Sequence, residues 1–440
     1  MKIIIIGAGQ VGSFLARELS NDHDVVVIEN DKDRSIKIRD TLDVLSLHGE
    51  GDNPTILMEA GLDKSDILLA VSGDDRTNIL SSLLASSLNL KNVVCRIRNR
   101  NYIEYFELLK DENICVVSPS EIISEKLSIL ISAPFAWKAE TFANGKAELF
   151  KLRVEEGTEI VNKRLQDIGP ASSWIFVGVS RAGNIQIPSG NTVLKAGDYV
   201  YALGDPAVLK RLKKLFNLKL DRIHSAIIVG GGRLGRRVAT TLLGLDISVK
   251  IIENDPERAE LVAEEIPGVT VFNGDATDAE CLKEAGVEST DYLAALTGDD
   301  ENNAFSALLA KNLGVKQTTV LYANPDYIDV LEAIGVDRAI SIRLAIANEV
   351  LSLLHLGGVA HIALVEEGRG EILEFDIEEG SGVMGKKLMD IHLPHESIVG
   401  ICLRDDEIIV PRGNFIPQLG DRLIVFTLPT AVKKVEKILG

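Results

Sequence analysis

The chain has 440 residues, with 47 lysines and arginines against 65 aspartates and glutamates, a net charge of −18 and a hydrophobic fraction of 46%. Its negative charge argues against nucleic acid or an anionic membrane as a partner through nonspecific electrostatics. No uninterrupted apolar run approaches the roughly 20 residues of a membrane-spanning helix, and a strand predicted from residue 3 leaves no room for a signal peptide. We therefore expect a soluble cytoplasmic protein with no direct membrane insertion, long enough for three or four domains.

The first predicted element is a strand followed by a glycine-rich loop, IIIIGAGQVG, at residues 3–12. Four consecutive isoleucines are typical of a strand that is buried on both faces of a parallel sheet. The G-x-G-x-x-G spacing of Gly7, Gly9 and Gly12 predicts a tight turn into a helix whose N-terminal N–H groups face a pyrophosphate. The other residues of this predicted anion-binding loop are Ala8, Gln10 and Val11.

The next apolar run, VVVIEND, contains Glu29. An acidic residue about 20 positions after the glycines is placed to accept hydrogen bonds from a ribose 2′-hydroxyl group. Because a carboxylate repels a 2′-phosphate, NADP is disfavoured. NAD and ATP share this ribose, so Glu29 does not decide between them.

Polar residues follow the third, fourth and fifth predicted strands, on the side where parallel sheets bind ligands. Asp52 follows the third strand, either beside an adenine pocket or as a turn-forming aspartate. Ser72 and Gly73 come at the end of the fourth strand. Arg96 and Arg98 alternate in the fifth, CRIRN, so their side chains should point to one side.

Two apolar segments predict helices that lead from a larger lobe into a smaller one. The first, residues 120–137, begins after Pro119 and ends near Pro134, and the second, residues 343–358, ends at a glycine pair. Apolar residues cover much of both segments. Each helix is expected either to lie in the core or to be buried against another subunit, and the sequence leaves both alternatives open.

The whole chain consists of two copies of one unit. Four pairs of matching residues are each 223 positions apart: Gly7 and Gly230, Gly51 and Gly274, Pro188 and Pro411, and Gly197 and Gly420. The second copy therefore has its own candidate nucleotide-binding residues: Gly230, Gly231, Gly232, Arg233, Leu234, Gly235, Glu253, Asp275, Thr297 and Gly298.

Each copy divides into two lobes. Alternating strands and helices predict an α/β, Rossmann-like lobe with a doubly wound parallel sheet, at residues 1–133 and again at 224–350. Short strands and turn signals predict a small α+β lobe, at residues 138–220 and again at 359–440.

The order and spacing of these parts resemble tandem RCK (regulator of K⁺ conductance) domains. The resemblance rests on the glycine loop, Glu29, Gly51 and Asp52, the segment SGDDRTN at residues 72–78, and the small lobe with its glycine turns. It covers essentially the full chain, as an N-lobe and a C-lobe in each half.

This resemblance implies a regulatory subunit and not an enzyme. Such tandems bind NAD(H), or ATP and ADP, and assemble as a ring, a dimer or tetramer, at the inner face of the cell membrane. There they gate a K⁺-translocating integral membrane protein of the TrkH or TrkG kind by changing shape. The resemblance also implies that Arg96 and Arg98 hold nucleotide phosphates; the alternative for this pair is a solvated edge of the sheet.

The rival hypothesis is an NAD-dependent oxidoreductase. Such an enzyme needs an acid or base at the nicotinamide, normally from a sizeable substrate domain. The small lobes offer His361, His392 and His395, which have no counterparts in the first copy. The four cysteines are scattered and lack the spacing of a zinc site. We therefore expect neither catalytic residues nor a metal site.

The two copies differ in where they carry positive charge. The glycine loop contains Gln10 in the first copy and Arg233 in the second. The strand arginines Arg96 and Arg98 are replaced by Leu321 and Ala323. We expect phosphate charge at the first site to be coupled to the arrangement of subunits, and the second site to be the more static binder.

Overall fold

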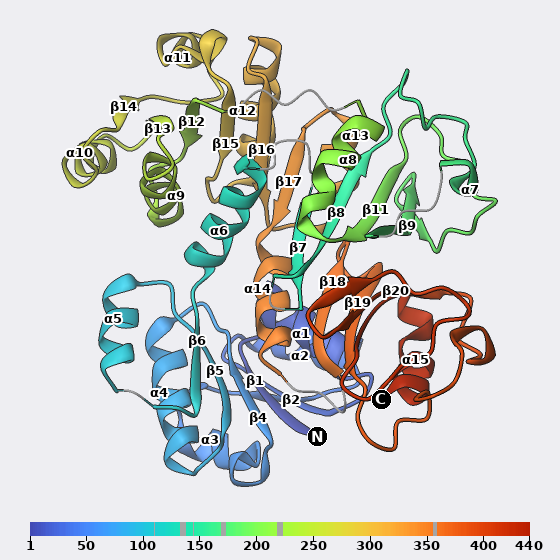
Figure 1. Ribbon diagram of the computed structural model, residues 1–440. Helices are drawn as coiled ribbons and strands as arrows, with labels where there is room; N and C mark the ends of the chain where they lie inside the picture. The colour runs from blue at the N-terminus through green and yellow to red at the C-terminus, as the bar shows by residue number, and fades with distance from the viewer. Residues whose placement is uncertain (110, 133–137, 144, 169–172, 218–222, 355–358) are drawn as a thin grey trace. The chain divides into compact units, whose positions relative to one another are not determined.

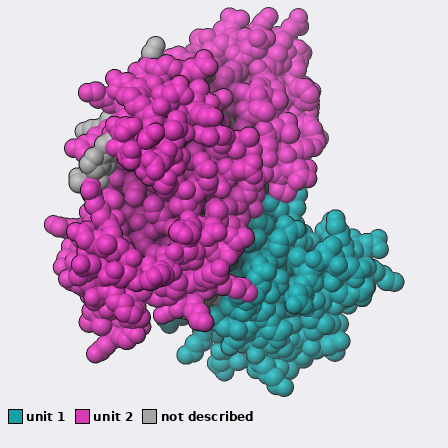
Figure 2. All heavy atoms as spheres, turned by 90° about the vertical axis from the view of Figure 1, so that its right-hand side faces the viewer, with its two compact units in different colours: residues 1–123, 342–354 teal, residues 124–341, 355–440 magenta. Residues whose placement is uncertain are grey.

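The computed structural model describes residues 1–109, 111–132, 138–143, 145–168, 173–217, 223–354 and 359–440 (Figure 1). These residues divide into two compact units, coloured separately in Figure 2. One unit contains residues 1–123 and 342–354, and the other contains residues 124–341 and 355–440. A segment of the second half of the chain therefore completes the unit that begins at the N-terminus.

The first N-lobe has a six-stranded parallel sheet in the order β3-β2-β1-β4-β5-β6, as expected for a doubly wound fold. Its isoleucine-rich strand β1 lies between β2 and β4, and residues 3–6 are at most 1% exposed, which confirms the prediction of burial on both faces. The strands are β1 (Lys2–Ile6), β2 (Asp24–Glu29), β3 (Leu45–His48), β4 (Ile67–Ala70), β5 (Asn92–Arg96) and β6 (Ile114–Val117). The helices between these strands are α1 (Gln10–Leu19), α2 (Lys32–Thr41), α3 (Pro54–Glu59), α4 (Asp75–Ser87) and α5 (Arg100–Leu109).

The second N-lobe repeats this topology, with strand order β14-β13-β12-β15-β16-β17. Its strands are β12 (Ser225–Val229), β13 (Ser248–Glu253), β14 (Thr270–Asn273), β15 (Tyr292–Ala295), β16 (Gln317–Tyr322) and β17 (Arg338–Ser341). Its helices are α9 (Arg233–Leu243), α10 (Pro256–Glu265), α11 (Ala279–Glu284), α12 (Asp300–Asn312) and α13 (Ile328–Ala333).

Each C-lobe has a five-stranded antiparallel sheet, ordered β10-β9-β11-β8-β7 in the first and β18-β19-β22-β20-β21 in the second. The first contains β7 (Lys138–Phe142), β8 (Ala147–Arg153), α7 (Leu165–Ile168), β9 (Trp174–Arg181), β10 (Asn184–Gln186), β11 (Tyr199–Gly204) and α8 (Leu209–Leu215). The second contains β18 (Val359–Val365), β19 (Gly370–Asp376), β20 (Ser397–Arg404), β21 (Glu407–Ile409), β22 (Arg422–Thr427) and α15 (Val432–Leu439).

The two C-lobe sheets pack against each other through one apolar core, with both contributing fully buried residues such as Tyr201 and Phe426. Glycines permit the close approach. A Cβ atom at Gly178 would lie 3.2 Å from the Phe426 ring, and one at Gly400 would lie 2.7 Å from the Leu203 side chain. The two C-lobes therefore form a single packed body within the second unit, which we call the C-lobe pair.

The connecting helices are α6 (Pro119–Ser132) and α14 (Ile342–Ser352). Helix α14 packs on α1, where the Arg343 guanidinium lies 4.5 Å from the centre of the Phe14 ring. In α6, the Ser124 hydroxyl hydrogen-bonds the Thr241 hydroxyl of α9 at 2.9 Å. Each helix thus contacts the helix that follows the glycine loop of the other half. Residues 133–137 and 355–358 of the predicted segments lie outside the described residues.

Among the described residues, no helix is long and apolar enough to cross a membrane. The same part of the chain contains no group of three or more histidine, cysteine, aspartate or glutamate side chains arranged to hold a metal ion.

Candidate functional site

The three glycines of the loop in the first N-lobe have two different structural roles. Gly7 has a φ of +96°, and a Cβ atom there would lie 2.8 Å from the Ser72 Cα. A Cβ atom at Gly12 would collide with the Gly7 carbonyl oxygen, whereas one at Gly9 would meet no atom within 4 Å. Gly7 and Gly12 are therefore required by the backbone, while Gly9 faces open space at the start of α1.

The loop of the second N-lobe repeats this geometry. Gly230 has a φ of +103°, a Cβ atom at Gly235 would collide with the Gly230 carbonyl oxygen, and Gly232 again faces open space. Both Gly9 and Gly232 are helix N-caps without a side-chain hydrogen bond. The N-terminal N–H groups of α1 and α9 therefore have no side-chain cap, as an anion-binding helix end requires.

The acidic residues at the ends of β2 and β13 are buried and hold the loops. Glu29 is 4% exposed; its carboxylate accepts hydrogen bonds from the N–H groups of Ala8 and Asp31, the latter at 2.9 Å. Glu253 is 3% exposed and accepts from Gly231 at 2.7 Å and Asp255 at 2.9 Å. This supporting role comes in addition to the predicted ribose contact, and the sequence analysis did not anticipate it.

The remaining loop residues offer a ligand different groups. The side chains of Ala8 and Val11 are buried, and the Ala8 N–H already donates to Glu29, so of these two residues only Val11 has a backbone N–H group suited to a ligand. Gln10 and Arg233 are exposed at the first positions of α1 and α9, where their side chains are free to turn toward a phosphate. In the second loop Gly231 is buried and Leu234 is half-buried.

Polar residues line the carboxyl ends of the next strands. A Cβ atom would meet no atom within 4 Å at Gly73 or at Gly298, so both loops are open toward solvent. The Asp275 carboxylate accepts hydrogen bonds from the N–H and hydroxyl groups of Thr277, at 2.8 and 2.7 Å, and these bonds lower its pKa. Asp275 is therefore a turn-forming aspartate; Asp52, at the equivalent place, is half-buried.

Two fully buried asparagines, which the sequence analysis missed, fix the ends of these strands. The Asn78 amide donates hydrogen bonds to the carbonyl oxygens of Ser72, at 3.1 Å, and Arg96, at 2.9 Å. The Asn303 amide donates in the same way to Thr297, at 3.1 Å, and Leu321, at 2.9 Å. A signal was present, because SGDDRTN and TGDDENN end in asparagine at the same position in both copies.

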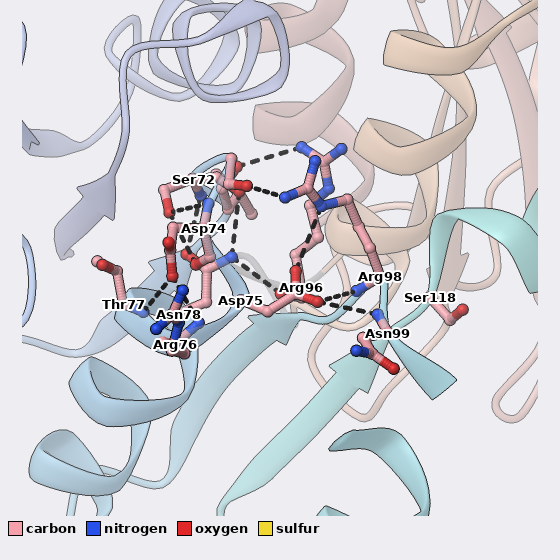
Figure 3. A network of polar contacts seen from close by, with 12 residues as sticks. Ser72, Asp74, Asp75, Arg76, Thr77, Asn78, Arg96, Arg98, Asn99 and Ser118 are labelled. Carbon is pink, nitrogen blue, oxygen red and sulfur yellow. Dashed lines mark hydrogen bonds and ion pairs between the residues drawn. The ribbon is translucent and has the colours of Figure 1, made fainter. Parts of the chain in front are cut away.

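The arginine pair lies beside the loop around Ser72 (Figure 3). The Arg98 guanidinium forms an ion pair with Asp75 at 3.3 Å and donates to the Gly73 carbonyl oxygen. Arg96 donates to the Val71 carbonyl oxygen at 3.3 Å, and its buried Nε has no partner among the described residues. Burial and the neighbouring Arg98 lower the pKa of Arg96 to about 10.

β5 lies between β4 and β6 and ends at Arg96, so Arg96 lies on an internal strand, whereas Arg98, which was predicted on the same strand, lies beyond its end. Arg96 and Arg98 are both half-buried beside the open Gly73 loop. A buried guanidinium nitrogen without a partner fits the requirement of a phosphate, which supplies several acceptor oxygens.

The second N-lobe has a cavity of about 220 Å³ at the carboxyl ends of its strands. It is lined by predicted residues Gly230, Gly232, Glu253, Asp275, Thr297 and Gly298. The lining also includes Arg258, whose guanidinium lies 3.5 Å from the Glu253 carboxylate. Asp300, the counterpart of Asp75, accepts hydrogen bonds from the N–H groups of Ala323 and Asn324. The structure thus brings six of the ten predicted residues of this copy together around one cavity, whose lining does not include Gly231, Arg233, Leu234 or Gly235.

Family models match most of the chain. The TrkA-N domain model matches residues 3–116 and 226–342, and the TrkA-C domain model matches residues 149–217 and 372–440. These matches reproduce the predicted repeat of an N-lobe and a C-lobe.

The chain is similar over its full length to potassium uptake proteins. It is 34% identical over 441 residues to a Trk system potassium uptake protein TrkA homolog of Archaeoglobus fulgidus, covering 100% of both chains. It is 31% identical over 456 residues to the Trk system potassium uptake protein TrkA of Haemophilus influenzae, covering 100% of this chain and 98% of the relative. Both relatives are named as potassium uptake proteins, and the chain is not an enzyme.

Solved structures share the fold. The GsuK RCK domain superposes with a TM-score of 0.61 at 19% identity, covering 100% of this chain and 94% of that one. The GsuK channel bound to NAD gives the same TM-score and identity, covering 100% of this chain and 78% of that one. With two RCK repeats, matched TrkA-N and TrkA-C domains and full-length relatives at more than 30% identity, the chain belongs to the TrkA family of Trk system potassium uptake proteins.

Proposed function

We propose that this chain is the nucleotide-binding regulatory subunit of a K⁺ uptake system. It binds NAD(H), or ATP and ADP, at both N-lobes and gates a K⁺-translocating membrane protein of the TrkH or TrkG kind from the cytoplasmic face of the membrane. The observation that carries this proposal is the pair of uncapped helix N-termini, each beside a glycine, Gly9 or Gly232, that faces open space. The GsuK channel, which shares the fold, has been solved with NAD and with ADP.

Contacts on the helices that follow the loops support a change of shape on binding. A ligand seated on α1 or α9 presses on a helix that itself carries a connecting helix from the other half, α14 or α6. Displacement of α1 or α9 would therefore be passed to the other half of the chain, since packed helices move as rigid bodies.

An exposed apolar face supports assembly into a ring. On α5 the side chains of Tyr105 and Leu108 are each 71% exposed, and Leu109 is 57% exposed. Large apolar side chains that gather on one helix are typical of a surface that another subunit covers. We infer that chains associate through this face as a homo-oligomer, a dimer or tetramer.

Growth at low external K⁺ tests the proposal. Deletion of the gene should impair K⁺ uptake, and the wild-type gene should restore it. The double variant Gly9→Asp and Gly232→Asp should not, because both added carboxylates project into the space reserved for phosphates. Gly9→Ala with Gly232→Ala is the matched control and should restore uptake. Normal K⁺ uptake in the deletion strain, with no other such subunit present, would refute the proposal.

A further inference from the structure

A lysine on β8 of the first C-lobe is buried where three lobes of the second unit meet. Lys151 is 4% exposed, and its ammonium group forms ion pairs with Glu332 of α13, at 2.5 Å, and with Glu366 in the turn between β18 and β19. The Tyr201 hydroxyl also donates to Glu366, and the Tyr199 ring centre lies 4.1 Å from the ammonium. Lys151 thus links both C-lobes to the second N-lobe.

A second ion pair holds the same helix. Arg369, in the same turn as Glu366, binds the Asp329 carboxylate through two nitrogens, at 2.9 and 2.8 Å. One of these nitrogens also donates to the Gly183 carbonyl oxygen of the first C-lobe, at 3.0 Å. Helix α13 is therefore attached at two points to the C-lobe pair. We call Lys151, Glu332, Glu366, Arg369 and Asp329 the α13 junction.

A chain of hydrogen bonds connects the junction to the second nucleotide cavity. The cavity is lined by residues 297–299, and Asp300 follows directly at the start of α12. The Asp300 carboxylate accepts hydrogen bonds from Ala323, at 3.0 Å, and Asn324, at 2.8 Å. The Asn324 side chain in turn accepts from the Asp326 N–H at 3.1 Å, two residues before α13 begins. A shift of the cavity loop therefore reaches α13 through ordered backbone.

The first repeat begins this path in the same way. Asp75 holds the N–H groups of Arg98 and Asn99, at 3.1 and 2.9 Å, just before α5. On α5, however, Glu104 pairs with Arg100 of the same helix, at 2.9 Å. Glu104 is the counterpart of Asp329, so this acid pairs within its own helix in the first repeat and with Arg369 of the C-lobe pair in the second.

The C-lobe pair shows the same asymmetry. Glu374 lies 223 positions after Lys151 and accepts a hydrogen bond from the Ala143 N–H, at 2.9 Å. Ala143 in turn lies 223 positions before Glu366. The contact between Lys151 and Glu366 is thus equivalent in the repeat to the contact between Glu374 and Ala143. The former is a buried ion pair, whereas the latter involves a neutral backbone group.

We propose that the α13 junction transmits nucleotide occupancy of the second site to the C-lobe pair. This inference rests on the proposed function, because it needs a nucleotide at that site. Buried ion pairs cannot be exchanged for water without opening the interface, so movement of α13 displaces the turn that carries Glu366 and Arg369. The second site is thereby the one that acts within a single chain, in place of the static binder that the sequence comparison suggests.

Hydrogen exchange measured by mass spectrometry tests the inference. In a Gly9→Asp background, which leaves the second site as the binding site, saturating NADH or ATP should slow exchange at residues 230–235 and at residues 365–369. Adding Glu332→Gln should leave the affinity within about threefold and keep protection at residues 230–235, but remove it at residues 365–369. Lys151→Met should do the same.

Lys146→Met is the matched control. Lys146 is half-buried and pairs with the exposed Asp406 between the same two C-lobes. Its replacement removes none of the ion pairs of the α13 junction, so this variant should keep both protections. If Lys151→Met does not fold, Glu332→Gln carries the test alone, because it retains side-chain volume and leaves Lys151 paired with Glu366.

Each outcome has one meaning. Protection at residues 230–235 without protection at residues 365–369 in the Gly9→Asp background would overturn the inference and leave the proposed function standing. Protection at both segments that survives Glu332→Gln would also overturn it. Absence of protection at residues 230–235 would overturn nucleotide binding at the second site, and the inference with it.

Discussion

The two N-lobes share a backbone and differ in the charged groups around it. In both, the first and third glycines are required by the turn and the middle one faces open space. In the first lobe Arg96 and Arg98 lie beside the site and α5 exposes apolar side chains. In the second lobe the strand arginines are absent and α13 is tied to the C-lobe pair. The repeat thus preserves the glycine loop, while the charged and apolar groups around the two lobes have diverged.

The largest effect is expected from the glycines that both loops need. Gly12→Val and Gly235→Val should each lower the free energy of unfolding by about 3 kcal/mol or more, because the new side chain collides with a backbone carbonyl group. Gly9→Ala and Gly232→Ala are the controls and should change it by less than about 1 kcal/mol. Urea unfolding followed by circular dichroism measures these differences. Equal effects of Gly12→Val and Gly9→Ala would contradict the division of roles between the glycines.

The next largest effect concerns the buried carboxylates. Glu29→Gln and Glu253→Gln should each cost about 1–3 kcal/mol of stability, because one backbone N–H would then face an amide N–H₂ group instead of an acceptor. The effects should be similar in the two repeats, since the contacts are the same. A loss in one repeat and none in the other would show that the loops are not equivalent.

The same carboxylates should select the ribose. Affinity for NADH should exceed that for NADPH by tenfold or more, about 1.4 kcal/mol, because a 2′-phosphate would lie beside a buried negative charge. Calorimetric titration with both nucleotides measures the ratio. Equal affinities for NADH and NADPH would contradict a contact between these carboxylates and the ribose.

A smaller effect should distinguish the two sites. Arg98→Ala should weaken ATP binding at the first site by about fivefold, near 1 kcal/mol. The variant lacks the guanidinium that pairs with Asp75 in the structure and that we expect to contact the phosphates. It should also abolish the change in particle dimensions that we expect small-angle scattering to show when ATP binds. Arg233→Ala is the counterpart in the second loop and should leave this change intact. The reverse pattern would contradict the assignment of the first site to contacts between subunits.

The smallest effect is a pH dependence in the second lobe. The hydrogen bonds from Thr277 hold the pKa of Asp275 below its ordinary 3.8, so its charged form stabilises the fold above the unfolded pKa, and this contribution is lost as pH falls through the folded pKa. Because Asp275 is mostly exposed, Asp275→Asn should cost only a few tenths of a kcal/mol at pH 7. The cost should shrink as pH falls below 3.8 and vanish below the folded pKa. A constant difference in unfolding free energy across this range would contradict the prediction.

The sequence predicts features that follow from local pattern. Residues 3–6, the glycine loops and the acidic residues that end the second strands are recognisable, because each depends on neighbours in the chain or on a fixed spacing. The supporting role of Glu29 was not, because its acceptor oxygens bind backbone N–H groups that no side-chain pattern reveals. Lys151 and Glu332 are 181 positions apart, so their ion pair depends on how three lobes pack.

The most direct test of the central claim, that one loop design serves two nucleotide sites, is a calorimetric titration of Gly9→Asp and Gly232→Asp. Wild-type chain should bind two nucleotides, with NADH or ATP as the probe. Each variant should bind one nucleotide, and the affinity of its substituted site should fall at least 100-fold, about 2.7 kcal/mol. The free energy of unfolding should not change, because both positions face open space. The double variant should bind none. Wild-type stoichiometry in the double variant would contradict the account.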